Sequence, residues 1–353
     1  MNKNLWWAQQ FIGFFLVFFY LPSSASPIKD DEFVQFMSGP AKLADDGSIS
    51  ANVILWVFEK ELRPGSQAAL ALWMRLDLAD LSAEDQESFR SRTQLFRIDS
   101  ERNKKITLKF PEANQKTFPL TDSSGLSHKK IKLKLERKYQ HGDKLNYSVV
   151  MPANDKREFN GKLVLVSEQG VSVISDIDDT IKDSHVLDKQ LLLRNTFVNP
   201  LHAVSGMSDW YQHLLNQNPT MSFHYVSSSP IQLYPLLDEF LQQEHFPAGS
   251  LHLRQIKLID ELFKEGSSSR RHKQQQIRSL LNQFPKRKFI LVGDSGESDP
   301  EIYATIARKY PAQIHNIYIR NVTDQNADNP RYQKTFAGLN KNQWKIFTEP
   351  TEI

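Results

Sequence analysis

The sequence predicts a mixed α/β protein in two parts, a β-rich N-terminal part followed by a parallel sheet covered by helices. One observation is a series of short β-forming runs separated by turn-rich pieces over residues 30–165. The other is the alternation of strand-like and helix-like segments over residues 166–353, which is typical of βαβ units. At 353 residues with 40% hydrophobic residues, the chain is long enough for two folded cores.

The first 25 residues have the organisation of a secretory signal peptide. A lysine lies in a short polar start, residues 11–21 are apolar, and Ser23 and Ala25 stand at the −3 and −1 positions of a cleavage site. We therefore expect a secreted or periplasmic protein. The alternative is an uncleaved membrane anchor, because residues 5–21 approach the roughly 20 residues that a transmembrane helix needs.

The β-rich part over residues 30–165 is expected to be sandwich-like. Its β-forming runs include ISANVILWVFEK, HKKIKLKLE and LNYSVVMP, and turn-rich pieces such as TDSSG and QHGDK separate them. Residues 67–96 are rich in alanine and acidic residues, which favours helix. The lysines of HKKIKLKLERK alternate with apolar residues, which is typical of the solvated face of a strand; contact with an anionic surface is the alternative. Nothing in this part resembles a catalytic set.

The composition argues against a nucleic-acid partner and excludes chemistry that depends on cysteine. The chain has 44 basic and 41 acidic residues and a net charge of only +3, so we expect no nucleic-acid partner. It contains no cysteine, which excludes disulfides and thiolate metal sites and suits an exported protein.

From Gly170 onward, strand-like and helix-like segments alternate. The strand-like runs are VSVISD, MSFHYVSSS, LHLRQI, KFILVGDS and IHNIYIRN. The helix-like segments are MSDWYQHLLNQ, PIQLYPLLDEFLQQ, RHKQQQIRSLLNQ and DPEIYATIARKY. This pattern predicts a parallel sheet with helices on both faces. Such sheets bind ligands outside the carboxyl ends of their strands, so we expect functional residues directly after the strands.

Acidic and hydroxyl residues lie at the ends of three predicted strands, and a lysine lies in the helix before the fourth strand. They are Asp176, Asp178 and Thr180 after the first strand, Ser227 and Ser228 at the end of the second, Lys273 near the start of a helix, and Asp294 and Asp299 after the fourth. One carboxylate can attack phosphorus, and a second can act as acid and base. A hydroxyl and an ammonium group can hold phosphoryl oxygens, and Mg²⁺ prefers carboxylate and phosphate oxygens. The set predicts Mg²⁺-dependent phosphoryl transfer through an aspartyl intermediate.

The same residues resemble the motifs of a known superfamily. Asp176-x-Asp178-x-Thr180, Ser227, Lys273 and Gly293-Asp294-x-x-x-x-Asp299 are similar to the four motifs of the haloacid-dehalogenase-like phosphohydrolases, whose catalytic domain is a Rossmann-like parallel sheet. The longer segments SDIDDTIK, FHYVSSSPIQLYP, FPAGSLHLR and FILVGDSGESDPEIY resemble the catalytic domain of phosphatidate phosphatases of the actin-patch-protein type. The likeness covers residues 160–323 of the chain.

This resemblance implies a role for each matching residue. Asp176 corresponds to the nucleophile, and Asp178 to the general acid that protonates the leaving alcohol and then activates water. Ser227 corresponds to a phosphate-binding hydroxyl, and Lys273 to the lysine that steadies the phosphoaspartate. Helical periodicity favours Lys273 over the two neighbouring arginines, which are the alternatives.

The implied metal and substrate sites use the same loops. The residues assigned to Mg²⁺ are Asp176, the backbone carbonyl of Asp178, Asp294 and Asp299, with Glu297 as the alternative in support; Thr180, Ser227 and Ser228 are assigned to the substrate. Two residues depart from the family. Ser228 stands in place of an expected asparagine and Ile231 in place of tryptophan, and both departures bear on substrate contacts.

Some nearby residues are better explained by structural roles. Asp179 and Asp183 are expected to be solvated loop acids. Ser229 is expected to cap the helix that follows it, since serine before proline is common at helix starts.

The spacing of the motifs bears on the substrate class. The segments after the first motif and between the second and third are short and mostly used by core elements, so little remains for a lid. An open site favours a bulky or surface-bound substrate. Together with the resemblance, which implies phosphatidate as the substrate, this leads us to expect hydrolysis of phosphatidate to diacylglycerol and phosphate, with peripheral contact to a membrane surface. The alternatives are the same chemistry on a phosphoprotein or small phosphomonoester, and a non-catalytic module that binds phosphate or Mg²⁺.

Overall fold

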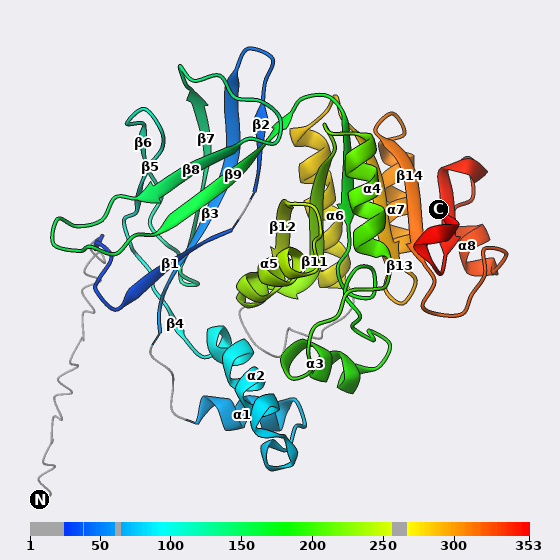
Figure 1. Cartoon of the computed structure of the whole chain (residues 1–353), viewed down its shortest axis with the longest axis horizontal. Coiled ribbons are helices and arrows are strands. Elements are labelled where there is room, and N and C mark those ends of the chain that lie inside the picture. Colours follow the sequence, from blue (N-terminus) through cyan, green and yellow to red (C-terminus); the bar gives the residue numbers. More distant parts are fainter. Residues whose placement is uncertain (1–24, 38, 61–64, 256–266) are drawn as a thin grey trace, which may run out of the picture.

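The chain folds around two β-sheets (Figure 1). The computed structural model describes residues 25–37, 39–60, 65–255 and 267–353, so residues 1–24 of the predicted signal peptide lie outside the described residues. The two sheets divide the chain between Ser167, which ends β9, and Val171, which begins β10. Among the described helices, none has the length and apolar character needed to cross a membrane.

The N-terminal sheet is largely antiparallel. Its strands are β1 (Glu32–Met37), β2 (Pro40–Leu43), β3 (Ser48–Glu59), β4 (Asp99–Ser100), β5 (Thr107–Lys109), β6 (Gln115–Thr117), β7 (Leu126–Lys134), β8 (Lys144–Val149) and β9 (Asn160–Ser167). Their order is β1-β3-β2-β9-β8-β5-β6, and β4 and β7 also pair with β3. Val53, Ile131, Tyr147 and Leu163 come from four different strands and meet in one buried cluster, so the sheet curves around its own core. The predicted β-rich part is confirmed, and its strands form one continuous sheet.

A helical insertion interrupts this sheet over residues 67–96, as predicted. It comprises α1 (Ser66–Trp73), the 3₁₀ turns η1 (Leu78–Asp80) and η2 (Gln94–Phe96), and α2 (Ala83–Thr93). The Ser82 hydroxyl begins α2 by accepting a hydrogen bond from the Asp85 backbone N–H at 3.1 Å. Arg92 Nη1 donates to the Asn199 carbonyl oxygen at 2.5 Å. The insertion therefore packs against the C-terminal part of the chain.

The C-terminal sheet is entirely parallel, as the alternating pattern predicts. Its strands are β10 (Val171–Ser175), β11 (Ser222–Pro230), β12 (Gly249–Arg254), β13 (Lys288–Asp294), β14 (Ile314–Arg320) and β15 (Trp344–Phe347), in the order β12-β11-β10-β13-β14-β15. The sequence did not predict β15, because four residues at a sheet edge give too short a pattern. The strand order changes direction between β10 and β13, and open α/β sheets bind ligands outside the carboxyl ends of the strands at such a point.

Helices cover both faces of the parallel sheet. They are α3 (Lys189–Phe197), α4 (Met207–Gln217), α5 (Tyr234–Gln243), α6 (Ser267–Gln283), α7 (Asp299–Lys309) and α8 (Pro330–Thr335), with short 3₁₀ turns η3 (Ile231–Leu233), η5 (Lys341–Gln343) and η6 (Pro350–Glu352). Residues of α4 and α5 share a buried cluster with Val173 of β10. Residues of α6 and α7 share another with Ile174, the next residue of the same strand. The predicted mixed α/β architecture is confirmed.

Candidate active site

The predicted site residues meet at the carboxyl ends of β10, β11 and β13. Asp176 directly follows β10, and its backbone N–H donates to the Val292 carbonyl oxygen of β13 at 2.8 Å. Asp294 ends β13, and Asp299 begins α7. A Cβ atom at Gly293 would lie 2.3 Å from Asp299 Oδ2, so only glycine lets this carboxylate approach the strand so closely.

Lys273 of α6 lies at the centre of the acidic residues. Its Nζ atom is 2.7 Å from Asp176 Oδ1, 2.6 Å from Glu297 Oε2 and 2.8 Å from Asp299 Oδ1. Burial alone lowers the pKa of Lys273, but the adjacent carboxylates outweigh it and hold the pKa well above its usual range. Arg270 and Arg271 are exposed, so Lys273 is the cation that the geometry brings to the carboxylates.

The carboxylates outnumber this single ammonium group. Burial raises the pKa of Asp176 well above its usual range; Lys273 opposes this shift, and Asp299, Glu297 and Asp294 add to it. The pKa of Asp294 is raised well above its usual range for the same two reasons, burial and neighbouring carboxylates. A site with unbalanced buried negative charge suits a further cation.

One buried acceptor in this site has no partner within the described residues. Asp294 Oδ1 accepts hydrogen bonds from the backbone N–H groups of Gly296 at 2.7 Å and Glu297 at 2.9 Å. Its Oδ2 atom is buried and accepts no hydrogen bond in the described part of the chain. Carboxylate oxygens of Asp176, Glu297 and Asp299 also lie within 4.8 Å of one another. Hard carboxylate oxygens in this number fit Mg²⁺.

Asp178 points its carboxylate at a different set of groups. Its Oδ1 atom is 3.0 Å from Lys182 Nζ and accepts from the Ser184 hydroxyl at 2.8 Å. Its Oδ2 atom accepts from the hydroxyls of Ser227 at 3.2 Å and Ser229 at 3.1 Å. Burial raises the pKa of Asp178, but Lys182 and these hydroxyl donors outweigh it and lower the pKa below its usual range. The two neighbouring aspartates therefore have pKa values shifted in opposite directions.

Sequence reasoning missed Lys182 and Ser184. Both side chains are buried, and Lys182 Nζ also donates to the Ser184 hydroxyl at 2.5 Å. Lys182 lies four residues after Asp178 in a loop. In a loop, no periodicity shows which side chains turn toward each other, so only its proximity to the first motif could have singled it out.

Two structural expectations near the site were wrong. Ser229 does not cap a helix: η3 begins after Pro230 without a side-chain cap, and the Ser229 hydroxyl donates to Asp178 instead. Asp179 is buried, and its carboxylate accepts three backbone hydrogen bonds, from Ser184, His185 and Val186. The acid that was expected to be solvated therefore holds the loop after the first motif in place.

The remaining predicted residues lie beside the carboxylates. Thr180 is buried, and its hydroxyl donates to Asp176 Oδ2 at 3.4 Å. The Ser228 hydroxyl pairs with that of Ser269 on α6. Asp183 is exposed, as expected.

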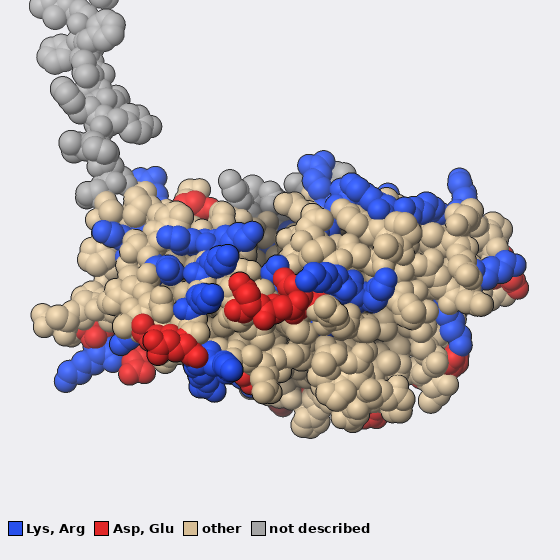
Figure 2. All heavy atoms as spheres, turned by 90° about the horizontal axis from the view of Figure 1, so that it is seen from above, with Lys and Arg blue, Asp and Glu red and all other residues tan. Residues whose placement is uncertain are grey.

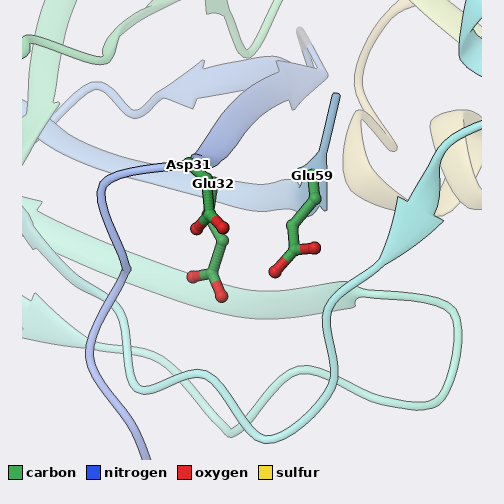
Figure 3. A group of neighbouring side chains, drawn as sticks. All are labelled: Asp31, Glu32 and Glu59. Carbon is green, nitrogen blue, oxygen red and sulfur yellow. The ribbon is translucent and has the colours of Figure 1, made fainter. Parts of the chain in front are cut away.

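A second acidic group lies in the N-terminal sheet, at the start of β1 and the end of β3 (Figure 3). It consists of Asp31, Glu32 and Glu59. Glu32 is fully buried and forms an ion pair with buried Lys104. Lys29 Nζ lies 3.3 Å from Glu59 and 3.6 Å from Glu32. Two lysines thus contact Glu32 and Glu59, whereas Asp31 is exposed to solvent, and the group joins β1 and β3 to the loop before β5.

Comparisons with known proteins match the part of the chain that carries the site. Residues 171–321 match the family described as the catalytic domain of phosphatidate phosphatase APP1. A 192-residue segment is 38% identical to phosphatidate phosphatase APP1 of Saccharomyces cerevisiae and covers 53% of this chain and 32% of the yeast protein. A 170-residue segment is 33% identical to an uncharacterized protein of Schizosaccharomyces pombe and covers 47% of this chain and 27% of that protein. The resemblance of the longer segments to the catalytic domain of phosphatidate phosphatases of the actin-patch-protein type is thus confirmed, and the matches cover less than a third of either relative's length.

Similarity to solved structures is weak. A bacterial chitinase, ChiW of Paenibacillus sp. str. FPU-7, aligns with a TM-score of 0.20 and 9% identity over 85% of this chain and 28% of its own. Such a score carries no argument about fold or function.

Proposed function

We propose that this protein is a Mg²⁺-dependent phosphatase that hydrolyses phosphatidate to diacylglycerol and phosphate through an aspartyl-phosphate on Asp176. The observation that carries the proposal is the buried Asp176 carboxylate, 2.7 Å from Lys273 Nζ, inside the segment that matches the phosphatidate phosphatase catalytic domain. The strand order and the position of each motif after a strand support a haloacid-dehalogenase-like architecture for this part.

The donor set supports a role for Mg²⁺. Asp176, Asp294 and the backbone carbonyl of Asp178 would hold the ion, with Asp299 or Glu297 in support. The partnerless Oδ2 atom of Asp294 and the excess of buried carboxylates favour this assignment. When bound, the ion supplies positive charge that favours the ionised form of the carboxylates and offsets the charge of the phosphate group.

In the first step, a carboxylate oxygen of Asp176 attacks phosphorus, and the bond from phosphorus to the glycerol oxygen breaks. The departing oxygen takes its proton from Asp178, which releases diacylglycerol. Ser227 and Thr180 donate hydrogen bonds to the phosphoryl oxygens, and the Lys273 ammonium group offsets their charge. Asp178 is ionised in the free protein, and an incoming phosphate dianion favours the protonated form that this step needs.

In the second step, Asp178 takes a proton from a water molecule, and the oxygen of this water attacks the aspartyl-phosphate. The bond between the Asp176 oxygen and phosphorus breaks and phosphate leaves. Asp176 is then a free carboxylate again, and Asp178 holds a proton as in the substrate complex, which it releases to solvent once phosphate has left. The four groups around Asp178 fix its carboxylate in one orientation, which favours both proton transfers.

The site of action follows from the predicted signal peptide and the lipid substrate. We propose that the protein is exported to the periplasm or beyond and acts at a membrane surface. Mass analysis of the exported protein tests this directly, since cleavage near Ala25 removes the apolar segment and an anchored form retains it.

The experiment that tests the proposed activity measures phosphate release from phosphatidate, lysophosphatidate, a phosphopeptide and p-nitrophenyl phosphate, each with Mg²⁺ and with EDTA. We expect release from phosphatidate that requires Mg²⁺ and is absent in Asp176→Asn. Release from the phosphopeptide or the small ester alone would assign the same chemistry to another substrate. No release from any of the four would favour a binding module.

A further inference from the structure

Four of the exposed large apolar side chains lie at the end of α1 and around the start of α3, and α3 follows the loop of the first motif. Leu72 is 79% exposed and Trp73 36% exposed at the end of α1, and Leu187 is 62% exposed and Leu191 40% exposed around the start of α3. We propose that these four residues, the apolar rim, dock the protein on the surface of the lipid bilayer that holds its substrate. This inference rests on the proposed lipid phosphatase function.

The second half of the rim is tied to the catalytic loop. The Asp179 carboxylate, next to Asp178 in the chain, accepts a hydrogen bond from the Val186 N–H at 2.6 Å. Leu187 is the next residue, and the Asp188 side chain then begins α3 by accepting from the Leu191 N–H at 3.1 Å. Leu187 and Leu191 therefore have fixed positions beside the catalytic aspartates.

The first half of the rim lies on a helix that is apolar on more than one side. Leu70 and Ala71 of α1 are buried in the same cluster as residues of α3 and of the parallel sheet. Leu72 and Trp73, the next two residues, are exposed. A surface helix normally keeps one side polar, so apolar side chains on the outer side of α1 indicate a second apolar contact.

The two halves of the rim are held together through α2. Arg92 Nη1 donates to the Asn199 carbonyl oxygen just after α3, and the Phe96 and Phe197 rings meet edge to face with centroids 5.5 Å apart. Figure 1 shows α3 below the parallel strands, with α1 and α2 next to it on the side of the N-terminal sheet. The N-terminal part thus contributes one half of a surface that borders the active site.

The geometry of the substrate favours a lipid surface as the occupant. The phosphate of phosphatidate must reach the buried Asp176 carboxylate while its acyl chains stay in the bilayer, so residues that border the site must contact that bilayer. Tryptophan suits the boundary between acyl chains and head groups. Exposed Arg75 follows Trp73 by two residues, and exposed Lys189 lies between Leu187 and Leu191; both can pair with anionic head groups.

A positively charged surface on the N-terminal sheet is another candidate for contact with a membrane. Exposed Lys130, Lys132 and Lys134 follow one another on the outer side of β7, and Figure 2 shows lysine and arginine side chains gathered over the N-terminal part in the view from above. Figure 1 shows that the parallel strands start at this upper end. Docking through that surface would turn the active site away from the bilayer, which favours the apolar rim as the contact.

The test compares the variant Leu72→Ser/Leu187→Ser with two controls. Val150→Ser removes an apolar side chain that is 42% exposed directly after β8, and Lys132→Ser removes a charge from β7. Binding is measured by cosedimentation with phosphatidylcholine vesicles that contain no phosphatidate, so that it is independent of turnover. Hydrolysis is measured on phosphatidate in such vesicles and on water-soluble p-nitrophenyl phosphate.

We expect the rim variant to bind vesicles about tenfold more weakly than the unchanged protein, because it loses the apolar contact of two leucines with the bilayer. The ratio of vesicle to soluble hydrolysis should fall to a similar extent, and neither control should change binding or ratio. Unchanged vesicle binding in the rim variant, an equal loss in a control, or a change only in self-association without lipid would overturn the docking surface. Vesicle binding through the rim without phosphatidate hydrolysis would support docking and contradict the proposed function.

Discussion

Among the residues that the structure describes, two groups of acidic side chains have carboxylate oxygens close enough together to share one cation, and they differ in what surrounds them. In the N-terminal sheet, Glu32 and Glu59 are paired with Lys104 and Lys29. At the ends of the parallel strands, Asp176, Glu297 and Asp299 all contact one ammonium group, and neighbouring Asp294 keeps an acceptor atom without a partner in the described chain. The first group is thus paired with two lysines and partly exposed to solvent, whereas the second is mostly buried and places three carboxylates around one ammonium group.

The difference teaches where to expect chemistry. A buried charge that is paired stabilises a local arrangement and leaves little capacity for a ligand. A group of buried carboxylates with too few cations costs free energy unless a ligand completes it, and such groups are found at functional sites. The comparison therefore predicts that changes in the first group alter stability and that changes in the second alter activity.

The largest expected effect is that of Asp176→Asn. An amide is a far poorer nucleophile than a carboxylate, so turnover should be abolished and no covalent phosphoenzyme should form. Intact-mass analysis after mixing with substrate measures the phosphoenzyme, and Asp31→Asn in the N-terminal group is the matched control that should keep full activity. Substantial turnover by Asp176→Asn would show that another group attacks phosphorus.

Asp178→Asn should have a smaller and different effect. The first transfer can still occur with a good leaving group, but hydrolysis of the aspartyl-phosphate lacks its base and should slow about 10²- to 10⁴-fold. A phosphoenzyme should therefore accumulate with p-nitrophenyl phosphate, which mass analysis detects. Equal, modest losses in Asp176→Asn and Asp178→Asn, without a phosphoenzyme, would indicate that the acids only hold metal and that water is the nucleophile.

Asp294→Asn tests the metal assignment. Loss of one carboxylate should raise the Mg²⁺ concentration needed for half-maximal activity about 10- to 100-fold, with the fold unchanged by circular dichroism. Glu59→Gln removes one carboxylate from the acidic group of the N-terminal sheet and should leave this Mg²⁺ concentration unchanged. Full activity of the unchanged protein in excess EDTA would contradict the metal requirement of the active site.

Much of the fold and part of the site could be predicted from the sequence. The apolar runs that form β10 and β13 alternate along the chain with segments of helical periodicity. Both patterns can be read from the order of apolar and polar residues within each segment. Asp176 and Asp294 could be placed because they directly follow those strands. The short edge strand β15 carries too little pattern to be recognised.

The rest of the site depends on contacts between distant segments. Burial of Asp179 and the contact of Ser229 with Asp178 depend on how a loop after β10 meets the end of β11, which residue types do not reveal. The apolar rim likewise combines α1 with the start of α3. Asp179 and Ser229 were misassigned because an acid in a loop and a serine before proline usually have the simpler role.

Lys104→Met tests whether the acidic group of the N-terminal sheet contributes to stability and not to activity. It removes the buried ammonium group beside Glu32 and leaves this carboxylate only the more exposed Lys29, 3.6 Å away, which should reduce the free energy of unfolding by about 3 kcal/mol. Turnover per folded molecule should stay the same, because this pair lies in the N-terminal sheet. Urea unfolding and activity of the folded fraction measure the two quantities, and a loss of turnover without a loss of stability would reverse the assignment of this group.

The smallest expected effect concerns histidines of the parallel sheet that we expect to be structural. The His224 ring contacts the Ser250 hydroxyl at 2.7 Å, and the same hydroxyl contacts His252 Nε2 at 2.8 Å. Burial lowers the pKa of His252 to about 4 and that of His224 well below its usual range. The unfolded chain then binds more protons than the folded protein below pH 6.5, so their contribution to stability is present above that pH and is lost as the pH falls toward 4.

His252→Gln should weaken this acid sensitivity. Removing one such histidine should reduce the loss of unfolding free energy between pH 7 and pH 5 by about 2 kcal/mol, while activity at pH 7 stays close to that of the unchanged protein. Urea unfolding at the two pH values measures this difference, and exposed His128→Gln of β7 is the control that should not change it. A large loss of activity at pH 7 in His252→Gln would show that this buried histidine takes part in catalysis. Hydrogen bonding to neighbouring side chains would then not suffice to identify a structural group in this sheet.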